Sequence, residues 1–148
     1  MREGGYLIID DTTWVRWAKK SEAVSWVWSS THARIVRGMQ VVLLIWTDGR
    51  VKVPLGLRLW HKGGHSKVEL AVQLLREAQR RGLCPQYVLF DSWYAAAKLL
   101  HLLADMDWKY VARLKSNRLF EGHKVRDKWR HRFGRGVGKL RKIKHEVA

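Results

Sequence analysis

The sequence is poor in cysteine and proline and has no long apolar run. Its single cysteine, Cys84, has no partner for an internal disulfide and no Cys or His at zinc-finger spacing, so we expect a small buried apolar residue. The longest apolar stretch, Val41 to Trp46, is far shorter than the roughly 18 residues that a membrane-spanning helix needs. The N-terminus also lacks a signal-peptide pattern. We therefore expect a cytoplasmic protein with no membrane partner.

Negative charge is scarce as well, with 13 Asp and Glu against 29 Lys and Arg and a net charge of +16. Because burying unpaired charge is costly, the positive surplus must lie mostly on the surface. Nucleic acid is the commonest partner for such a surface, since each phosphate that Lys or Arg neutralises releases counterions. An anionic membrane surface is the weaker alternative.

The positive charge is densest toward the C-terminus. Residues 115–148 hold 12 Lys and Arg against 3 acidic residues, which leaves 17 and 10 for residues 1–114. With four glycines and few large apolar residues, this segment is expected to bury little surface. We predict a core domain over residues 1–114 and an extended or partly disordered basic arm over residues 115–148.

The apolar pattern of the core alternates between strand and helix periods and predicts an α/β fold with the element order βββαβαβ. An antiparallel meander would lead into a βαβ unit, so the last strands should be parallel and covered by helices. Residues 14–39 show no sustained period and are interpreted as a long, partly helical excursion. The predicted strands are 6–9, 40–47, 50–59, 87–90 and 109–114, and the predicted helices are 67–82 and 93–104.

Local signals mark the turns and helix ends. Asp48 and Gly49 form the two-residue signal for a tight hairpin in which both central positions take positive φ. Ser66 followed three residues later by Glu69 is a capping box, which predicts that a helix starts there. Ser92 is placed to cap the second helix.

Two aspartates, Asp11 and Asp91, lie at the ends of predicted strands that are 80 residues apart in the sequence. Functional sites in open α/β sheets gather at the carboxyl ends of parallel strands, so neighbouring strands would bring both carboxylates to one edge. Two converging carboxylates repel unless a divalent cation lies between them, and Mg²⁺ binds through one or two carboxylates plus substrate phosphates. The alternative is that Asp10 and Asp11 form a turn while Asp91 begins a helix.

The residues around these aspartates carry a family resemblance. YLIIDDTT (6–13) and YVLFDSWY (87–94) resemble the first and second catalytic-aspartate motifs of bacterial insertion-sequence transposases. These belong to the DDE group whose third motif is Tyr-Arg-Glu-Lys-like. The resemblance covers residues 5–118, including the predicted helix at 67–82 and the segment ARLKSN (112–117). It implies an RNase H-like mixed sheet.

By that resemblance, Asp11 is the first metal ligand, Asp91 is the second, and Asp10 is an orienting neighbour. The family implies Mg²⁺- or Mn²⁺-dependent phosphoryl transfer of the two-metal type. Transposon ends would be cleaved with water, and the freed 3′-hydroxyl would be joined to target DNA without a covalent enzyme intermediate. Full-length members of the family can form homodimers.

The sequence departs from the family pattern at the third acidic ligand. No Tyr-Arg-Glu-Lys-like segment is present, and Glu121 and Glu146 are poor substitutes because they lie in the basic arm. We expect a fragment, truncated at both ends, in which residues 115–148 alternatively begin the family's insertion. A non-catalytic, basic nucleic-acid-binding domain derived from a transposase is the alternative function.

Several basic, histidine and tryptophan residues are candidates for contacts with DNA. His61 and His65 flank two glycines and are interpreted as loop or DNA-facing residues rather than as metal ligands. The tryptophans Trp14, Trp17, Trp26 and Trp28 could stack on unpaired bases, but core packing is the favoured interpretation. The cationic candidates for backbone contacts are Arg58, Lys62, Lys67, Lys115, Arg118, Lys124 and Arg126, for which solvated surface charge is the alternative.

Overall fold

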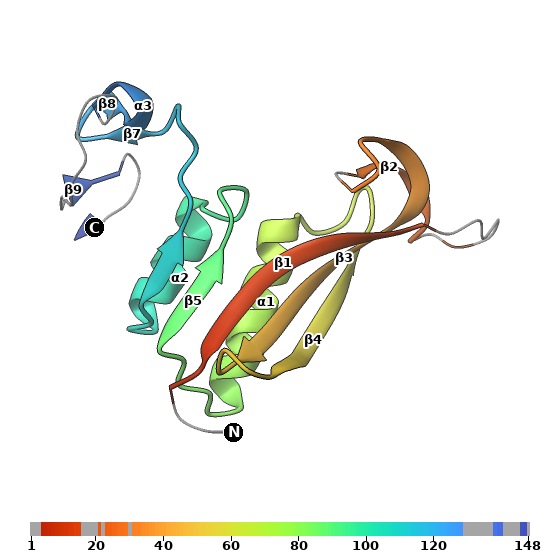
Figure 1. Cartoon of the computed structure of the whole chain (residues 1–148), viewed down its shortest axis with the longest axis horizontal. Helices are drawn as coiled ribbons and strands as arrows, with labels where there is room; N and C mark the ends of the chain where they lie inside the picture. Colours follow the sequence, from red (N-terminus) through yellow and green to blue (C-terminus); the bar gives the residue numbers. More distant parts are fainter. Residues whose placement is uncertain are drawn as a thin grey trace.

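A six-stranded mixed sheet forms the centre of the molecule in the computed structural model (Figure 1). The structure describes residues 4–15, 21, 23–29, 31–128, 138–140 and 146–147. The strands follow the order β2-β3-β1-β5-β6, and β4 also pairs with β3. Their bounds are β1 (Tyr6–Val15), β2 (Ser25–Ser29), β3 (Arg34–Thr47), β4 (Lys52–Trp60), β5 (Tyr87–Phe90) and β6 (Tyr110–Ala112).

The antiparallel half of the sheet is built on the long strand β3. One edge of β3 pairs with all of β1, from Tyr6↔Thr47 to Val15↔Gly38. The other edge pairs first with β2 and then with β4. The prediction of a partly helical excursion over residues 14–39 is thus wrong for its described residues, because the ladder of β3 draws them into strands.

The hairpin between β3 and β4 lies where it was predicted but has a different turn. Thr47 pairs with Lys52, so the connection has four residues, Asp48 to Val51. Oδ1 of Asp48 accepts hydrogen bonds from the backbone N–H groups of Arg50 and Val51, both at 2.9 Å. Within this loop only Gly49 has a positive φ, of 92°. The two-residue turn was therefore wrong, because the Asp48 side chain satisfies the turn backbone instead.

The parallel half of the sheet consists of β1, β5 and β6. β5 pairs with β1 from Tyr6↔Tyr87 to Ile9↔Phe90 and with β6 on its other side. The first strand and the strand at residues 87–90 are therefore neighbours, which was the condition under which both aspartates were expected to share one edge of the sheet. β6 covers only the middle of the strand predicted at 109–114.

Two helices connect these strands. α1 (Lys67–Arg80) begins with the predicted capping box, in which Ser66 and Glu69 exchange hydrogen bonds. α2 (Ala97–Asp105) begins four residues later than predicted, and its N-cap, Ala96, makes no side-chain capping bond. Ser92 lies in a turn after β5 and does not cap α2, so that prediction was wrong.

Both helices pack on the same face of the sheet (Figure 1), and this layer forms the core. Leu7 and Ile9 of β1 point into it, and the next residue on that face of the strand is Asp11. Asp11 therefore lies directly beyond the buried core residues of β1, on the same face of the strand. Other fully buried core side chains are Leu44, Leu74, Leu75, Val88, Leu99, Leu100 and Leu103.

Short elements follow the sheet in the basic segment. They are β7 (Leu119–Phe120), β8 (His123–Lys124), α3 (Val125–Lys128), β9 (Gly138–Lys139) and β10 (Glu146–Val147). Phe120 and Leu140 form an isolated bridge and are 6% and 3% exposed. These two residues therefore bury apolar surface, whereas the extended or partly disordered arm over residues 115–148 stays a prediction.

Cys84 is exposed, not buried as predicted, because it lies in the loop after α1. In the described part of the chain, no helix is long and apolar enough to cross a membrane.

Candidate active site

Asp11 and Asp91 lie toward the carboxyl ends of β1 and β5, which are adjacent parallel strands of the sheet. Asp91 directly follows β5, as predicted. Asp11 lies inside β1, paired with Val42 of β3, although the first strand was expected to stop at residue 9. The pairing of β1 with β5 ends at Ile9 and Phe90, so both aspartates come after the last parallel pair.

The carboxylate of Asp11 is held by two side chains from the helical layer. The ammonium of Lys67 lies 2.5 Å from Oδ2, and the hydroxyl of Tyr94 donates a hydrogen bond to Oδ1 at 3.0 Å. The side chains of Asp11 and Lys67 are 25% and 16% exposed, so this ion pair is largely shielded from water. Both carboxylate oxygens of Asp11 therefore have a donor.

Tyr94 is 1% exposed, and its hydroxyl lies against negative charge. Burial, followed by the nearby Asp11 carboxylate, raises the pKa of Tyr94 far above its usual value. The phenol therefore remains protonated at neutral pH and serves only as a hydrogen-bond donor to Asp11. Tyr94 lies in the turn after β5, and its hydrogen bond fixes the rotamer of the Asp11 side chain on β1.

The start of α1 places Lys67 beside Asp11. Ser66 accepts a hydrogen bond from the backbone N–H of Glu69, and Glu69 accepts one from Ser66 at 3.0 Å. Glu69 also accepts a hydrogen bond from Lys98 at 2.9 Å, which together with Ser66 lowers the pKa of Glu69 to about 2. Lys67 is the first residue of the helix that this cap defines.

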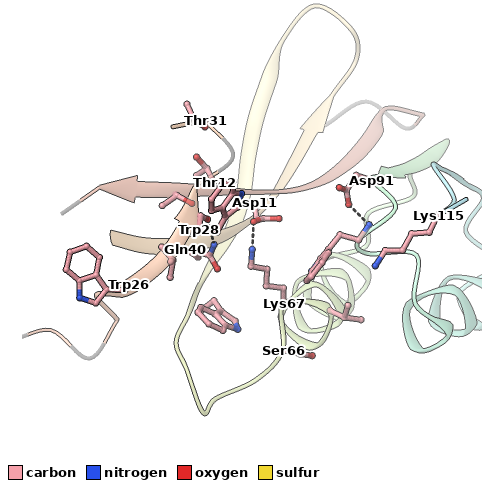
Figure 2. Close-up of a pocket in the computed structure, with 15 residues that line it drawn as sticks. Asp11, Thr12, Trp26, Trp28, Thr31, Gln40, Ser66, Lys67, Asp91 and Lys115 are labelled. Atoms are coloured by element: carbon pink, nitrogen blue, oxygen red, sulfur yellow. Dashed lines mark hydrogen bonds and ion pairs between the residues drawn. The ribbon is translucent and has the colours of Figure 1, made fainter. Parts of the chain in front are cut away.

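Asp91 is more exposed than Asp11, and its Oδ1 accepts a hydrogen bond from the backbone N–H of Trp93 at 2.8 Å. Both aspartates line one open cavity of about 820 Å³. Figure 2 shows Lys67 reaching toward Asp11, with Asp91 and Lys115 on one side of that pair and Trp26 and Trp28 on the other. The other lining residues are Thr12, Thr13, Val27, Thr31, Gln40, Trp60, Ser66, Val68 and Trp93.

Among the residues that the structure describes, two acidic residues, Asp11 and Asp91, line this cavity. In that part of the chain, no group of three or more His, Cys, Asp and Glu side chains could hold a metal ion. Glu121 lies in the β7–β8 turn and does not line the cavity, and the side chain of Glu146 lies outside the described residues. In proteins generally, Mg²⁺ binds through one or two carboxylates together with waters and the oxygens of substrate phosphates.

The cationic residues predicted to contact DNA are dispersed over the molecule. Lys115 lines the cavity, and its ammonium lies 4.7 Å from the centroid of the Trp93 ring. Exposed Lys62 lies in the loop before α1, Lys124 lies on β8, and Arg126 on α3 pairs with Asp127 at 3.3 Å. Of these, the structure places Lys115 together with the two aspartates.

Two predicted DNA contacts, Arg58 and Arg118, have partners within the fold. Arg58 on β4 pairs with Glu77 of α1. Arg118 donates a hydrogen bond to the carbonyl of Ala95, and burial lowers the pKa of its guanidinium. Both guanidinium groups therefore tie elements of the domain together.

Sequence reasoning missed the joint role of Lys67 and Tyr94. Lys67 was considered only as a phosphate ligand, and Tyr94 appeared only as the last residue of the second motif. The position of Lys67 directly after a capping serine was a usable signal, because it places the side chain at a helix start near the strand ends.

The favoured core packing of the tryptophans was also wrong where the structure describes them. Trp14, Trp26 and Trp28 are 42%, 70% and 61% exposed. Trp17 lies outside the described residues. His61 and His65 lie exposed in the loop before α1, where His65 is 3.8 Å from Glu69.

Comparisons with known proteins concern the family and the fold of the chain. Residues 1–147 match the family model of the DDE superfamily endonucleases. One similar solved structure is the synaptic complex of piggyBac transposase with hairpin DNA, with a TM-score of 0.58 and 18% identity over 88% of this chain. This chain spans 27% of the piggyBac chain, and the likeness is one of mixed α/β fold.

A second solved structure is the simian T-cell lymphotropic virus intasome in complex with PP2A regulatory subunit B56 gamma. It has a TM-score of 0.44 and 13% identity, and the match covers 79% of this chain and 36% of the other. No curated protein matches the sequence. Because the family model spans nearly the whole sequence, the chain belongs to the DDE superfamily endonucleases.

Proposed function

We propose that this domain takes part in DNA transposition, as the part of a DDE transposase that carries Asp11 and Asp91. The observation that carries the proposal is that these carboxylates line one open cavity at the end of adjacent parallel strands. Endonucleases of this superfamily generally depend on divalent metal ions. The proposed ligands are Asp11 and Asp91, the proposed metal is Mg²⁺ or Mn²⁺, and a third acidic ligand would come from outside the described residues.

A bound divalent metal would activate the attacking oxygen and stabilise the leaving oxygen of a phosphodiester in an in-line displacement. The attacking group is water in strand cleavage and the freed 3′-hydroxyl in strand transfer. Asp11 and Asp91 are the scaffold in both steps and form no covalent bond to DNA. Tyr94 keeps the Asp11 carboxylate oriented through the hydrogen bond to Oδ1.

Lys67 has two roles in this proposal. Without metal, its ammonium neutralises Asp11 and relieves the repulsion between the two carboxylates. A divalent cation held by Asp11 and Asp91 would compete with the ammonium of Lys67 for Asp11, and the charge of Lys67 would then be available within the cavity to a phosphate oxygen of the DNA backbone. The cation and the substrate would thus bind cooperatively.

The test is a nicking assay on supercoiled DNA with Mg²⁺ or Mn²⁺, comparing the chain with its Asp11→Asn and Asp91→Asn variants. Each substitution removes a charge with little change in shape and should abolish metal-dependent nicking. Asp105→Asn is the matched control, because Asp105 is an exposed aspartate at the end of α2 that does not line the cavity. Nicking that survives both cavity substitutions would refute the assignment.

A non-catalytic DNA-binding domain is the second candidate. Two observations favour it. In the described part of the chain, the site has two carboxylates and no third acidic ligand, and the ammonium of Lys67 is paired with one of them, Asp11. It predicts DNA binding that weakens steeply with salt, with no strand cleavage at any Mg²⁺ or Mn²⁺ concentration. Measuring binding and nicking on the same preparation separates the two candidates.

A further inference from the structure

Three large aromatic side chains around the carboxylate cavity are left open to solvent. Trp26, Trp28 and Trp93 are 70%, 61% and 58% exposed, and all three line the cavity that contains Asp11 and Asp91. Exposed tryptophans gathered in one concave site are typical of a ligand-binding surface. The site therefore offers flat apolar faces next to its charged groups.

We propose that this cavity binds unpaired nucleotides of a DNA strand next to the phosphate that is attacked, with bases stacking on Trp28 and Trp93. The inference rests on the proposed function, because it concerns the DNA that the same cavity would receive. A nucleotide has a planar aromatic base and an anionic phosphate. The cavity presents the matching pair, indole rings beside the ammonium groups of Lys67 and Lys115.

Trp28 is fixed by the strand that carries it. Its neighbours on β2, Val27 and Ser29, are 7% and 0% exposed, and its carbonyl accepts a hydrogen bond from the Gln40 side chain at 3.3 Å. Alternation along the strand therefore places the indole of Trp28 on the open side. A rigid platform of this kind loses little conformational entropy when a base stacks on it.

Trp93 is fixed from the other side of the site. Its backbone N–H donates to Asp91, so its position is tied to the second proposed metal ligand. The ammonium of Lys115 lies over one face of its ring, 4.7 Å from the centroid, so a base would stack on the opposite face. A nucleotide at this location could thus contact the Trp93 ring with its base and the Lys115 ammonium with its phosphate.

The two tryptophans lie in elements on either side of the aspartate pair, Trp28 on β2 and Trp93 in the turn after β5. Figure 2 shows Trp28 on the Asp11 side and Lys115 on the Asp91 side of the cavity. A strand that crosses the site between them would hold its phosphate near the carboxylates. Bases of an intact duplex are covered by their neighbours, so only unpaired bases offer faces to both rings.

A protein segment is the competing occupant of such an apolar surface. The cationic group of Lys115 argues against it, because an apolar segment laid over this ammonium would desolvate its charge without neutralising it, whereas Lys67 is already paired with Asp11. DNA phosphates provide that neutralisation. The ammonium of Lys115 beside the exposed indole rings therefore favours a nucleic-acid occupant.

The experiment compares two fluorescein-labelled duplexes of the same sequence, one fully paired and one with a three-nucleotide single-stranded gap. Their dissociation constants for the full chain are measured by fluorescence anisotropy without divalent metal. We expect tighter binding of the gapped DNA. Trp28→Ala and Trp93→Ala should each weaken that binding roughly 5-fold or more and change duplex binding less than about 2-fold.

Trp14→Ala is the matched control, since Trp14 is an exposed tryptophan on β1 that does not line the cavity. It should change neither constant, and Trp28→Phe should retain most of the preference. Equal losses on both DNAs, or no preference for the gap, would overturn the stacking proposal alone. No binding to either DNA would overturn the proposed function as well.

A second measurement avoids dependence on how the variants fold. 2-Aminopurine placed in the gap should lose fluorescence when it stacks on an indole of the unmodified chain, whereas the same base within the duplex should not respond to the chain. An unquenched probe on bound gapped DNA would contradict stacking.

Discussion

The ammonium nitrogen of Lys67 lies 2.5 Å from Oδ2 of Asp11, in an ion pair that joins the start of α1 to the middle of β1. A divalent cation at that oxygen would place two positive centres within a few ångströms of each other, which is strongly repulsive away from bulk water. Occupancy by metal and the position of Lys67 are therefore coupled.

Removing the Lys67 charge should strengthen the binding of a divalent cation to the aspartate pair. In Lys67→Met the cation no longer competes with an ammonium, and we expect Mn²⁺ affinity to rise roughly 3- to 5-fold, the equivalent of about 1 kcal/mol. Electron paramagnetic resonance of free Mn²⁺ measures this directly. Lys98→Met, which removes the exposed lysine paired with Glu69, should leave the affinity unchanged. Unchanged or weaker Mn²⁺ binding in Lys67→Met would rule out the competition.

Tyr94→Phe should destabilise the fold while preserving its packing. The substitution removes the hydroxyl that donates to Asp11 and keeps the buried ring, so the free energy of unfolding should fall by about 1–2 kcal/mol. Urea denaturation at pH 7 measures the loss. Tyr87→Phe is the control, since Tyr87 is a half-buried tyrosine on β5 whose ring stacks on that of Tyr6. A similar loss in both variants would mean that the bond to Asp11 contributes nothing specific.

The same tyrosine makes stability dependent on alkaline pH. The pKa of Tyr94 is raised in the folded state by burial and by Asp11. Its contribution is therefore complete below the usual tyrosine pKa of about 10 and is lost as pH rises above that value. The difference in unfolding free energy between the unmodified chain and Tyr94→Phe should shrink from pH 9 to higher pH. A difference that grows with pH would contradict the raised pKa.

Glu69 should make the start of α1 sensitive to acid. The hydrogen bonds from Lys98 and Ser66 lower its pKa to about 2, so its contribution is present above the usual glutamate pKa of about 4.3 and is lost as pH falls toward 2. Glu69→Gln should lower the urea midpoint at pH 7 and have a smaller effect at pH 3. An equal effect at both pH values would show that the carboxylate charge is not involved.

The predicted DNA contacts should divide into two groups when each is changed to alanine. Lys115→Ala should weaken DNA binding at all sequences and reduce the slope of log K against log salt by about 1, as expected for the loss of one phosphate contact. Arg58→Ala should mainly lower the thermal midpoint, because Arg58 is paired with Glu77 across β4 and α1. Anisotropy titrations at several salt concentrations and thermal melts separate the two effects. A larger salt-slope change for Arg58→Ala would reverse this division.

Elements defined by local signals could be predicted from the sequence. β5 was predicted with its observed bounds and α1 with its observed start, because an apolar run bounded by polar residues and a capping box act within a few residues. The proximity of Asp11 and Asp91 was predicted for the same reason, since both follow apolar runs of strand length. Parallel neighbours then bring them to one edge.

Features set by distant partners could not be predicted. β1 continues through Asp11 to Val15 only because β3, more than twenty residues later, pairs with it along its whole length. The ion pair of Lys67 with Asp11 and the exposure of Trp28 depend on that sheet and on where α1 is packed against it. No local periodicity encodes such contacts.

The register between β1 and β3 determines whether Asp10 or Asp11 faces the cavity. Adjacent residues of a strand point to opposite faces, so a slip of one position would put Asp10 beside Lys67 and turn Leu7 and Ile9 out of the core. The slipped chain would still present a carboxylate to the cavity. The apolar side chains below the site, rather than the acidic side chains in it, therefore determine which aspartate faces the cavity.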